Sequence, residues 1–222
     1  MMRRMKVLTW AAAVVAFGAT TPSLPVAAAT PPPGTPQGSR AGIALPTRPS
    51  TGLWMGSLHV VLELTNLFEV QKAAAVGAIS SQGEAGEGIS WLCYTNLSSP
   101  TPERIWIATG NEMGGPERRV MSLTAQLVPE GLATADCPAL PPALTSVRID
   151  NGLWLNAKVR AVANALHTAV NEGQEWQQFS YSGKVPGTGG RAPEGCDLLN
   201  GLAVKLRAGR VAFLQIYQVT SC

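Results

Sequence analysis

The amino-acid sequence predicts an α+β fold of two tandem helix-then-antiparallel-sheet units, each with one amphipathic helix packed on a three- or four-stranded sheet. The first observation is that Gly-Leu-Trp occurs at residues 52–54 and again at 152–154. The second is that three later blocks recur in the same order, the clearest being "RVMSLTAQLV" (119–128) and "RVAFLQIYQV" (210–219). The third is that apolar residues in these blocks alternate with period two, as in half-buried strands. Ordered repetition within one chain is typical of a duplicated structural unit.

The segment before the first repeat has the features of an export signal. Residues 1–6 carry three positive charges, residues 7–19 form an apolar run, and three alanines at 27–29 match a cleavage position. The apolar run is shorter than the roughly 20 residues that a membrane-spanning helix needs. We therefore expect residues 1–29 to be a signal peptide that is removed, and the mature protein to be exported, either periplasmic or secreted.

The remaining chain divides by composition. Residues 30–50 are rich in proline, glycine and serine, which predicts a disordered linker. The two repeats then span 51–139 and 140–222. No stretch in them is long and apolar enough to predict a membrane span.

The balance of charges excludes one class of partner. The chain has 17 Lys and Arg against 14 Asp and Glu, and the expected leader holds three of the basic residues and no acid. Removing those three leaves 14 basic and 14 acidic residues. A nucleic-acid partner is therefore not expected, because such proteins carry a clustered excess of positive charge.

Each repeat is expected to begin with its helix. In the first, Ser57 is the predicted N-cap of a helix, and a second helical stretch follows at 69–79. The predicted inward side chains of the first helix are Val60, Val61, Leu64, Leu67 and Phe68. In the second repeat, Asn156 is the predicted N-cap. The inward side chains there are Val159, Val162, Ala163, Leu166 and Val170. We expect Trp54 and Trp154, which precede the two helices, to be buried.

The four cysteines, in an exported protein, predict two disulfides. A zinc site is the alternative, but the sequence has no Cys-x-x-Cys pair and no histidine near a cysteine. Three disulfide pairings are possible. We prefer Cys93–Cys137 with Cys196–Cys222, because this choice places one bridge in each repeat.

A Gly-Leu-Trp segment, a capped amphipathic helix, a Trp-bearing strand and two further strands resemble the module of the BamE-like (SmpA/OmlA) outer-membrane assembly lipoproteins. Tandem duplication with one disulfide per copy resembles the β-lactamase inhibitor protein (BLIP) family. The resemblance covers roughly residues 50–222. It implies the fold and a role in binding another protein. It also leaves open an envelope-assembly role, although no cysteine lies at the cleavage position to carry a lipid anchor.

The aligned strands differ on the face that a helix would leave free. Phe213 and Tyr217 stand in the second repeat where the first has Ser122 and Gln126. Aromatic side chains on a rigid sheet are typical anchors of protein interfaces. We expect Phe213 and Tyr217, with Phe179 and Tyr181 from the neighbouring strand, to bind another protein. The alternative is that the free faces of the two repeats pack on each other.

Catalytic signatures are lacking in the sequence, which contains no G-x-S-x-G, H-E-x-x-H or Walker motif. Its two histidines, His59 and His167, fall on predicted polar helix faces at non-equivalent positions. We therefore expect a non-enzymatic binding protein with no cofactor and no metal. A secreted enzyme whose catalytic groups are distant in sequence stays as an alternative.

Overall fold

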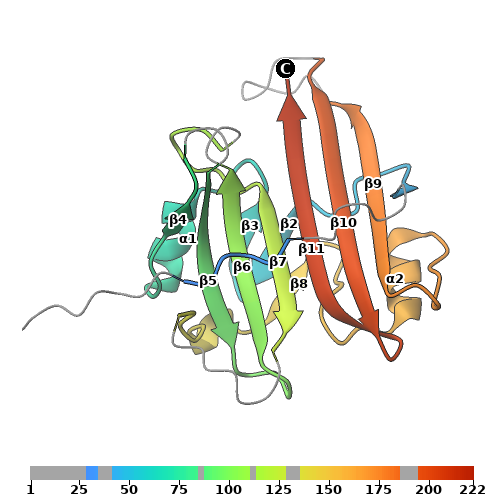
Figure 1. Cartoon of the computed structure of the whole chain (residues 1–222), viewed down its shortest axis with the longest axis horizontal. Helices are drawn as coiled ribbons and strands as arrows, with labels where there is room; N and C mark the ends of the chain where they lie inside the picture. Colours follow the sequence, from blue (N-terminus) through green and yellow to red (C-terminus); the bar gives the residue numbers. More distant parts are fainter. Residues whose placement is uncertain (1–28, 35–41, 85–87, 111–113, 129–135, 186–194) are drawn as a thin grey trace, which may run out of the picture.

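Figure 1 shows a computed structural model of the chain, which describes residues 29–34, 42–84, 88–110, 114–128, 136–185 and 195–222. The expected signal peptide, apart from Ala29, lies outside the described residues. The elements are β1 (Ile43–Ala44), β2 (Gly52–Met55), β3 (Leu58–Val61), α1 (Leu67–Ala74), β4 (Ser80–Gln82), β5 (Ile89–Asn96), β6 (Glu103–Gly110), β7 (Ser122–Leu127), the 3-10 turn Pro142–Leu144, β8 (Val147–Ile149), α2 (Val159–Leu166), β9 (Trp176–Lys184), β10 (Asp197–Arg207) and β11 (Arg210–Ser221).

Strands from both halves of the chain join in one sheet. Its order is β1-β9-β10-β11-β7-β6-β5-β4, with β1 parallel to β9 and every other neighbouring pair antiparallel. The junction is the pairing of β11 with β7, in which Phe213 lies opposite Gln126 and Tyr217 opposite Ser122. A smaller sheet of order β3-β2-β8 also crosses the predicted boundary, because Leu53 in β2 pairs with Ile149 in β8.

The predicted fold class is therefore wrong. The structure is mostly β, and the described residues hold two α-helices of eight residues each, too little to form two separate helix-on-sheet units. Edge-to-edge pairing of β7 with β11 satisfies backbone groups that two separate sheets would each leave open at an edge.

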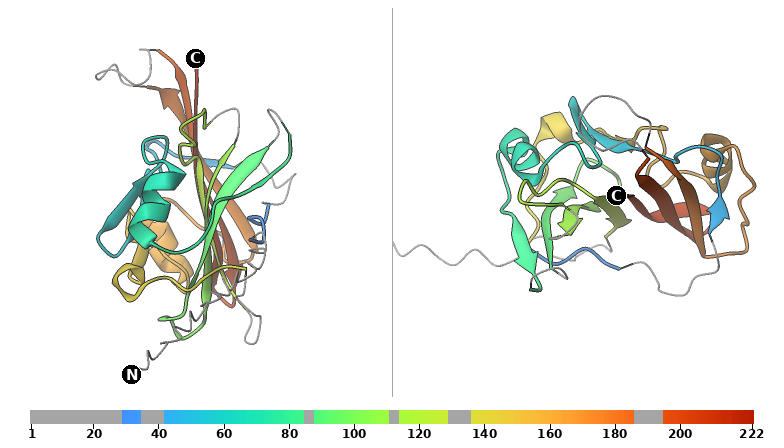
Figure 2. Two further views of the ribbon diagram at one scale, coloured as in Figure 1. Left: turned by 90° about the vertical axis from the view of Figure 1, so that its left-hand side faces the viewer. Right: turned by 90° about the horizontal axis from the view of Figure 1, so that it is seen from above.

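The helices and the small sheet lie together on one side of the large sheet, which we call its inner face (Figure 2). The main hydrophobic core fills the space between them. Its members from α1 and α2 include Leu67, Val70, Val162 and Leu166. Residues 29–34 cross the opposite side, the outer face (Figure 2). Both helices of the described residues therefore cover the same face of the sheet.

The helix predicted from Ser57 is wrong because the chain turns back instead. Gly56 has a φ of 57° and lies so close to the Ala143 carbonyl that a side chain would clash there. This turn makes β2 and β3 a hairpin, and Val60 is buried from a strand. The helix begins later, at Leu67, and only its residues 69–74 coincide with the stretch 69–79 that was predicted to be a second helix. Asn66 and Glu69 form its capping box, with amide-to-oxygen distances of 2.9 and 2.8 Å.

Helix α2 lies where the second repeat predicted one, and it buries Val159, Val162 and Leu166 as expected. Its N-cap, however, is Lys158, which makes no side-chain capping hydrogen bond. Asn156 has a φ of 63°, and its amide donates to the Val211 carbonyl at 2.8 Å. This contact ties the start of the helix to β11, so Asn156 orients the helix through its backbone rather than capping it.

Part of the segment predicted to be a disordered linker is ordered in the structure. Ile43 and Ala44 form β1 opposite Phe179 and Ser180 of β9, and the Leu45 amide donates to the Ser180 carbonyl at 2.8 Å. A short edge strand of this kind needs few apolar residues, so composition did not reveal it. Residues 35–41 of the same segment lie outside the described residues.

The predicted disulfides are confirmed. Cys93 is bonded to Cys137 and Cys196 to Cys222, with Cα–Cα distances of 5.0 and 4.5 Å. The second bridge closes the open end of the β10–β11 ladder. No helix in the part of the chain that the structure describes is both long and apolar enough to cross a membrane. The two disulfides are compatible with an exported protein.

Candidate binding face

The outer face of the sheet carries three rows of side chains across β9, β10, β11 and β7. Residues directly opposite each other in antiparallel strands share a face, so the register assigns each row. The rows, each in strand order, are Trp176, Lys205, Phe213 and Gln126; Gln178, Ala203, Gln215 and Thr124; and Ser180, Gly201, Tyr217 and Ser122.

Two of the four predicted binding residues lie in these rows. Phe213 is only 4% exposed and meets Trp176 edge-to-face, with ring centroids 5.0 Å apart and planes at 63°. Tyr217 is half-buried, and its ring lies directly over Gly201 on the neighbouring strand, where any side chain would displace it. Phe213 is thus mainly part of the packing beneath Trp176, whereas Tyr217 and Trp176 are accessible.

The other two predicted residues, Phe179 and Tyr181, do not lie on the outer face. Phe179 pairs with Leu202 and is 1% exposed within the main core. Tyr181 pairs with Asn200 in the same inward register, and its ring lies beside Gly183. Strand β10 also separates β9 from β11. The prediction of one face with four aromatic residues is therefore wrong, because alternation within a strand does not fix the register between strands.

Trp176 is the aromatic residue of this face that sequence reasoning missed. In β9 it lies two and four residues before Gln178 and Ser180, so all three side chains share the outer face, and Phe179 lies on the opposite face. Its ring has Lys205 above it, with Nζ 5.4 Å from the centroid. The same ammonium lies 3.0 Å from Oε1 of Glu175. The sequence "QEWQQFSY" (174–181) shows this tryptophan, but only the register between β9 and β10 shows which face of the sheet its side chain occupies.

A hollow of about 340 Å³ opens beside the aromatic pair. The residues that line it include Trp176 and Phe213 together with three cations, Lys205, Arg207 and Arg210. None of the described residues that line it is acidic. Of the cations, Arg210 is partly held by its Nη1, which donates to the Asn156 carbonyl at 2.8 Å. The hollow therefore has aromatic side chains in its lining and positively charged side chains around them.

A second hollow of about 300 Å³ lies further along the same strands and is neutral. Its lining includes Gln178, Ala203, Gln215 and Tyr217. The Gln215 amide donates to Thr124 Oγ1 at 3.1 Å, which fixes the direction of its side chain. Together the two hollows offer amide groups, aromatic edges and positive charge on one continuous surface.

The other half of the outer face is filled. Ala29, Trp91, Cys93, Trp106, Ala108 and Cys137 form a small second core there. The chain at 29–34, which we call the strap, crosses over β5 and β6 above it (Figure 1). The accessible outer face among the described residues is therefore the part over β9, β10, β11 and β7.

Two carboxylates that could have suggested catalysis serve to hold the fold. Glu103 is 2% exposed and accepts hydrogen bonds from Asn96 Nδ2, Ser99 Oγ and Trp154 Nε1 at 2.9, 2.9 and 3.0 Å. Glu63 accepts from the Gln218 side chain at 2.7 Å and also from Thr220. Carboxylates with this many donors are structural acceptors in a closed network.

The two histidines lie apart. His59 Nε2 is 2.8 Å from Asp150 Oδ1, and its ring is stacked on Trp54 at 4.0 Å. The Thr51 hydroxyl donates to the same carboxylate at 2.7 Å. In a catalytic triad the hydroxyl would bond to the histidine ring instead, so Thr51, His59 and Asp150 are not arranged as one. His167 follows α2 as its C-cap residue. Trp54 and Trp154 are both only partly buried, but Trp154 packs against the main core and Trp54 is not among the residues packed there, so the expectation that both are core residues holds for Trp154 only in part and fails for Trp54.

The outer face thus combines two accessible aromatic side chains, Trp176 and Tyr217, with positively charged and amide groups, which suits recognition of another molecule. The described residues contain no cluster of three or more His, Cys, Asp or Glu side chains that could hold a metal ion. Comparison with family models, with curated proteins and with solved structures found no match to this chain, so the candidate site rests on the geometry of this face.

Proposed function

We propose that this chain is an exported, non-enzymatic protein-binding module, and that its partner docks on the outer face across β9, β10, β11 and β7. The observation that carries the proposal is that two accessible aromatic side chains, Trp176 and Tyr217, each line one of the two hollows on this rigid sheet. The resemblance to the BLIP family supports an inhibitor-like role, and the two disulfides support a periplasmic or secreted location.

The physical argument is one of low entropic cost. Side chains on a sheet held by long ladders are already ordered, so a partner loses little conformational freedom by contacting them. Aromatic rings bury a large area with few rotatable bonds. Such anchors commonly carry most of the binding free energy of an interface. The cations around Trp176 favour a partner whose contacting segment is acidic.

The experiment compares three variants of the purified mature protein as immobilised bait against periplasmic and culture-medium extract. Tyr217→Ala and Trp176→Ala each remove one of the two accessible aromatic rings of the outer face. Tyr181→Ala is the matched control, since it truncates a half-buried tyrosine of the same sheet in the inward register. Phe213 is a poorer choice, because a ring only 4% exposed contributes to stability as well.

A protein retained by the wild type and Tyr181→Ala, but lost with Tyr217→Ala and Trp176→Ala, supports the proposal. Each loss should amount to about 2 kcal/mol, or roughly 30-fold in Kd. Inhibition of a purified β-lactamase, measured with the same four proteins, tests the inhibitor-like role directly. Retained proteins that are unaffected by the outer-face variants would overturn the assignment of this face.

A further inference from the structure

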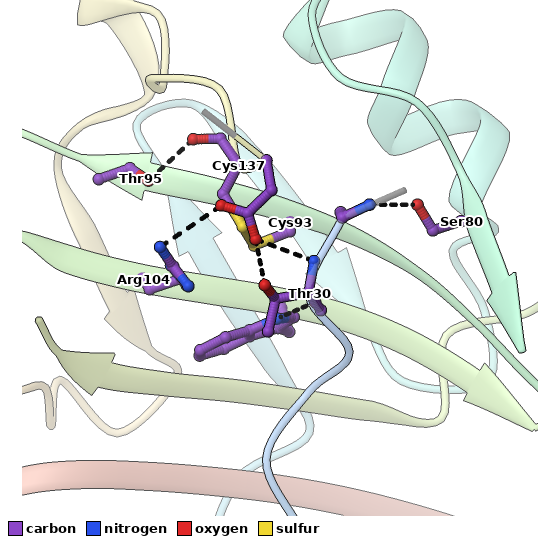
Figure 3. The surroundings of a disulfide bond; sticks show 9 residues. Thr30, Ser80, Cys93, Thr95, Arg104 and Cys137 are labelled. Carbon is purple, nitrogen blue, oxygen red and sulfur yellow. Dashed lines mark hydrogen bonds and ion pairs between the residues drawn. A yellow bond between two sulfur atoms is a disulfide. The ribbon is translucent and has the colours of Figure 1, made fainter. Parts of the chain in front are cut away.

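The strap begins where the expected leader ends, and its first two residues differ in their surroundings. Ala29 is 8% exposed, and its amide nitrogen donates to Oγ of Ser80 at 3.0 Å. The amide nitrogen of Thr30 is 3.0 Å from Oδ2 of Asp136, and the Thr30 hydroxyl donates to the same oxygen. Figure 3 shows these contacts around the Cys93–Cys137 disulfide.

The Asp136 carboxylate is itself held in place. Arg104 Nη2 is 3.6 Å from Oδ1 of Asp136, and Trp106 Nε1 donates to the Thr30 carbonyl at 2.9 Å. Partial burial raises the pKa of Asp136, but hydrogen bonds from the Thr30 side chain and backbone and from its own amide, and the charge of Arg104, together lower this pKa below its ordinary value. The carboxylate is therefore ionised and directed at the nitrogen of Thr30.

Two peptide bonds here match the small-residue pattern of leader removal, 28–29 and 29–30. Hydrolysis of either bond consumes one water and leaves a carboxylate on the leader and an α-ammonium on the new first residue. At Ala29 that ammonium would lie in a small apolar core with only the Ser80 hydroxyl as its partner, and burying an unpaired charge is costly. At Thr30 it would lie beside a carboxylate.

We propose that signal peptidase cleaves between Ala29 and Thr30, and that the new α-ammonium of Thr30 forms an ion pair with Asp136. The nitrogen is already within hydrogen-bond distance of the carboxylate, so cleavage adds a charge to a contact that exists in the uncleaved chain. Thr30 itself is exposed, so the ammonium keeps part of its hydration while it gains an anionic partner.

This ion pair has a consequence for the outer face. Residues 31–33 are three prolines, which favour an extended chain and have no amide hydrogen to donate. The strap is therefore anchored chiefly by Thr30. Its far end, Pro33 and Gly34, forms part of the wall of the hollow beside Trp176 and Phe213. Fastening Thr30 thus holds one wall of that hollow, and the added charge strengthens a contact that already positions this wall.

The first test is the intact mass of the protein exported with its own leader. A mature chain that begins at Thr30 supports the proposal. A chain that begins at Ala29 or earlier, and is heavier by one alanine residue or more, overturns it.

The second test measures the ion pair by thermal melts of four proteins that begin at Thr30 or at Ala29, each with Asp136 or with Asp136→Asn. The Ala29 start keeps the Thr30 amide donor but moves the charge away. We expect Asp136→Asn to lower Tm by about 2 °C more in the Thr30 form than in the Ala29 form. Equal losses in the two forms would overturn the ion pair.

The matched control is Asp197→Asn, which removes an exposed ion pair with Lys184 at 2.7 Å elsewhere on the sheet. Its effect on Tm should be the same for both starting residues. If Asp197→Asn also lowered Tm more in the Thr30 form than in the Ala29 form, and by as much as Asp136→Asn does, the cause would be a general change in charge. That result would also overturn the specific ion pair with Asp136.

Discussion

Replacing Trp154 with phenylalanine should lower the stability of the protein more than the same replacement at Trp54. The Trp154 indole donates a hydrogen bond of 3.0 Å to Oε2 of Glu103, a carboxylate that is 2% exposed. Phenylalanine keeps an aromatic ring but has no donor. Trp54 is held by stacking on His59, with planes 2° apart, and phenylalanine can make the same contact.

The size of the difference follows from the contacts that remain. A hydrogen bond to a charged group contributes about 1.5–3 kcal/mol. Because Glu103 keeps the donors of Asn96 and Ser99, we expect the lower half of that range, about 1.5–2 kcal/mol. A chain of this size loses about 2–4 °C in Tm per kcal/mol. Trp154→Phe should therefore lower Tm by about 3–8 °C, and Trp54→Phe by less than about 2 °C.

The assay is thermal unfolding of the oxidised protein, followed by circular dichroism, for both single variants and for Trp154→Phe combined with Glu103→Gln. In a double-mutant cycle, a shared hydrogen bond makes the combined loss differ from the sum of the single losses. Equal losses at the two tryptophans, or full additivity with Glu103→Gln, would refute the reasoning and leave ring packing as the only contribution of Trp154.

Two further predictions concern the covalent and ionic contacts. Replacing both Cys196 and Cys222 with alanine should lower the free energy of unfolding by about 3.5 kcal/mol from loop entropy, since the closed loop spans 26 residues; urea titration measures this, and an unchanged midpoint would contradict it. Because the folded-state pKa of Asp136 is lowered, its contribution to stability is present above pH about 4 and is lost as the pH falls through that lowered pKa. Tm measured from pH 5 to pH 2 should therefore fall less for Asp136→Asn than for the wild type, and parallel curves would disagree with this.

The disulfides and the apolar face of α2 could be predicted because both depend on local features. Cysteines that pair within one half of the chain need only a small loop, and the spacing of Val159, Val162 and Leu166 is a property of the helix alone. The helix predicted from Ser57 failed for a tertiary reason. The approach of Gly56 to Ala143, 87 residues further along the chain, fixes the turn that makes this segment a hairpin.

The binding face could be predicted only in part for a similar reason. Period-two alternation states which residues of one strand share a side, and so it grouped Phe213 with Tyr217 correctly. It does not state which strand lies next to which, or in what register. Phe179 was therefore assigned to the wrong face and Trp176 was missed, because the pairing of β9 with β10 places Trp176 outward and Phe179 inward. The contact of Trp106 with Thr30 spans 76 residues and left no local signal.

The position of β11 at the centre of the large sheet constrains the order in which the protein acquires its structure. Strands β5, β6 and β7 follow one another and can pair as soon as they emerge, but the second edge of β7 pairs only with β11, as in the contact of Ser122 with Tyr217, 95 residues later. A chain that emerges with its N-terminal end first, as in synthesis, therefore presents β7 with one open edge until residues 210–221 arrive. Open edges of this kind recruit strands from other molecules. The interval between the arrival of β7 and that of β11 is thus the period in which crowding or a missing chaperone would divert the chain into aggregates.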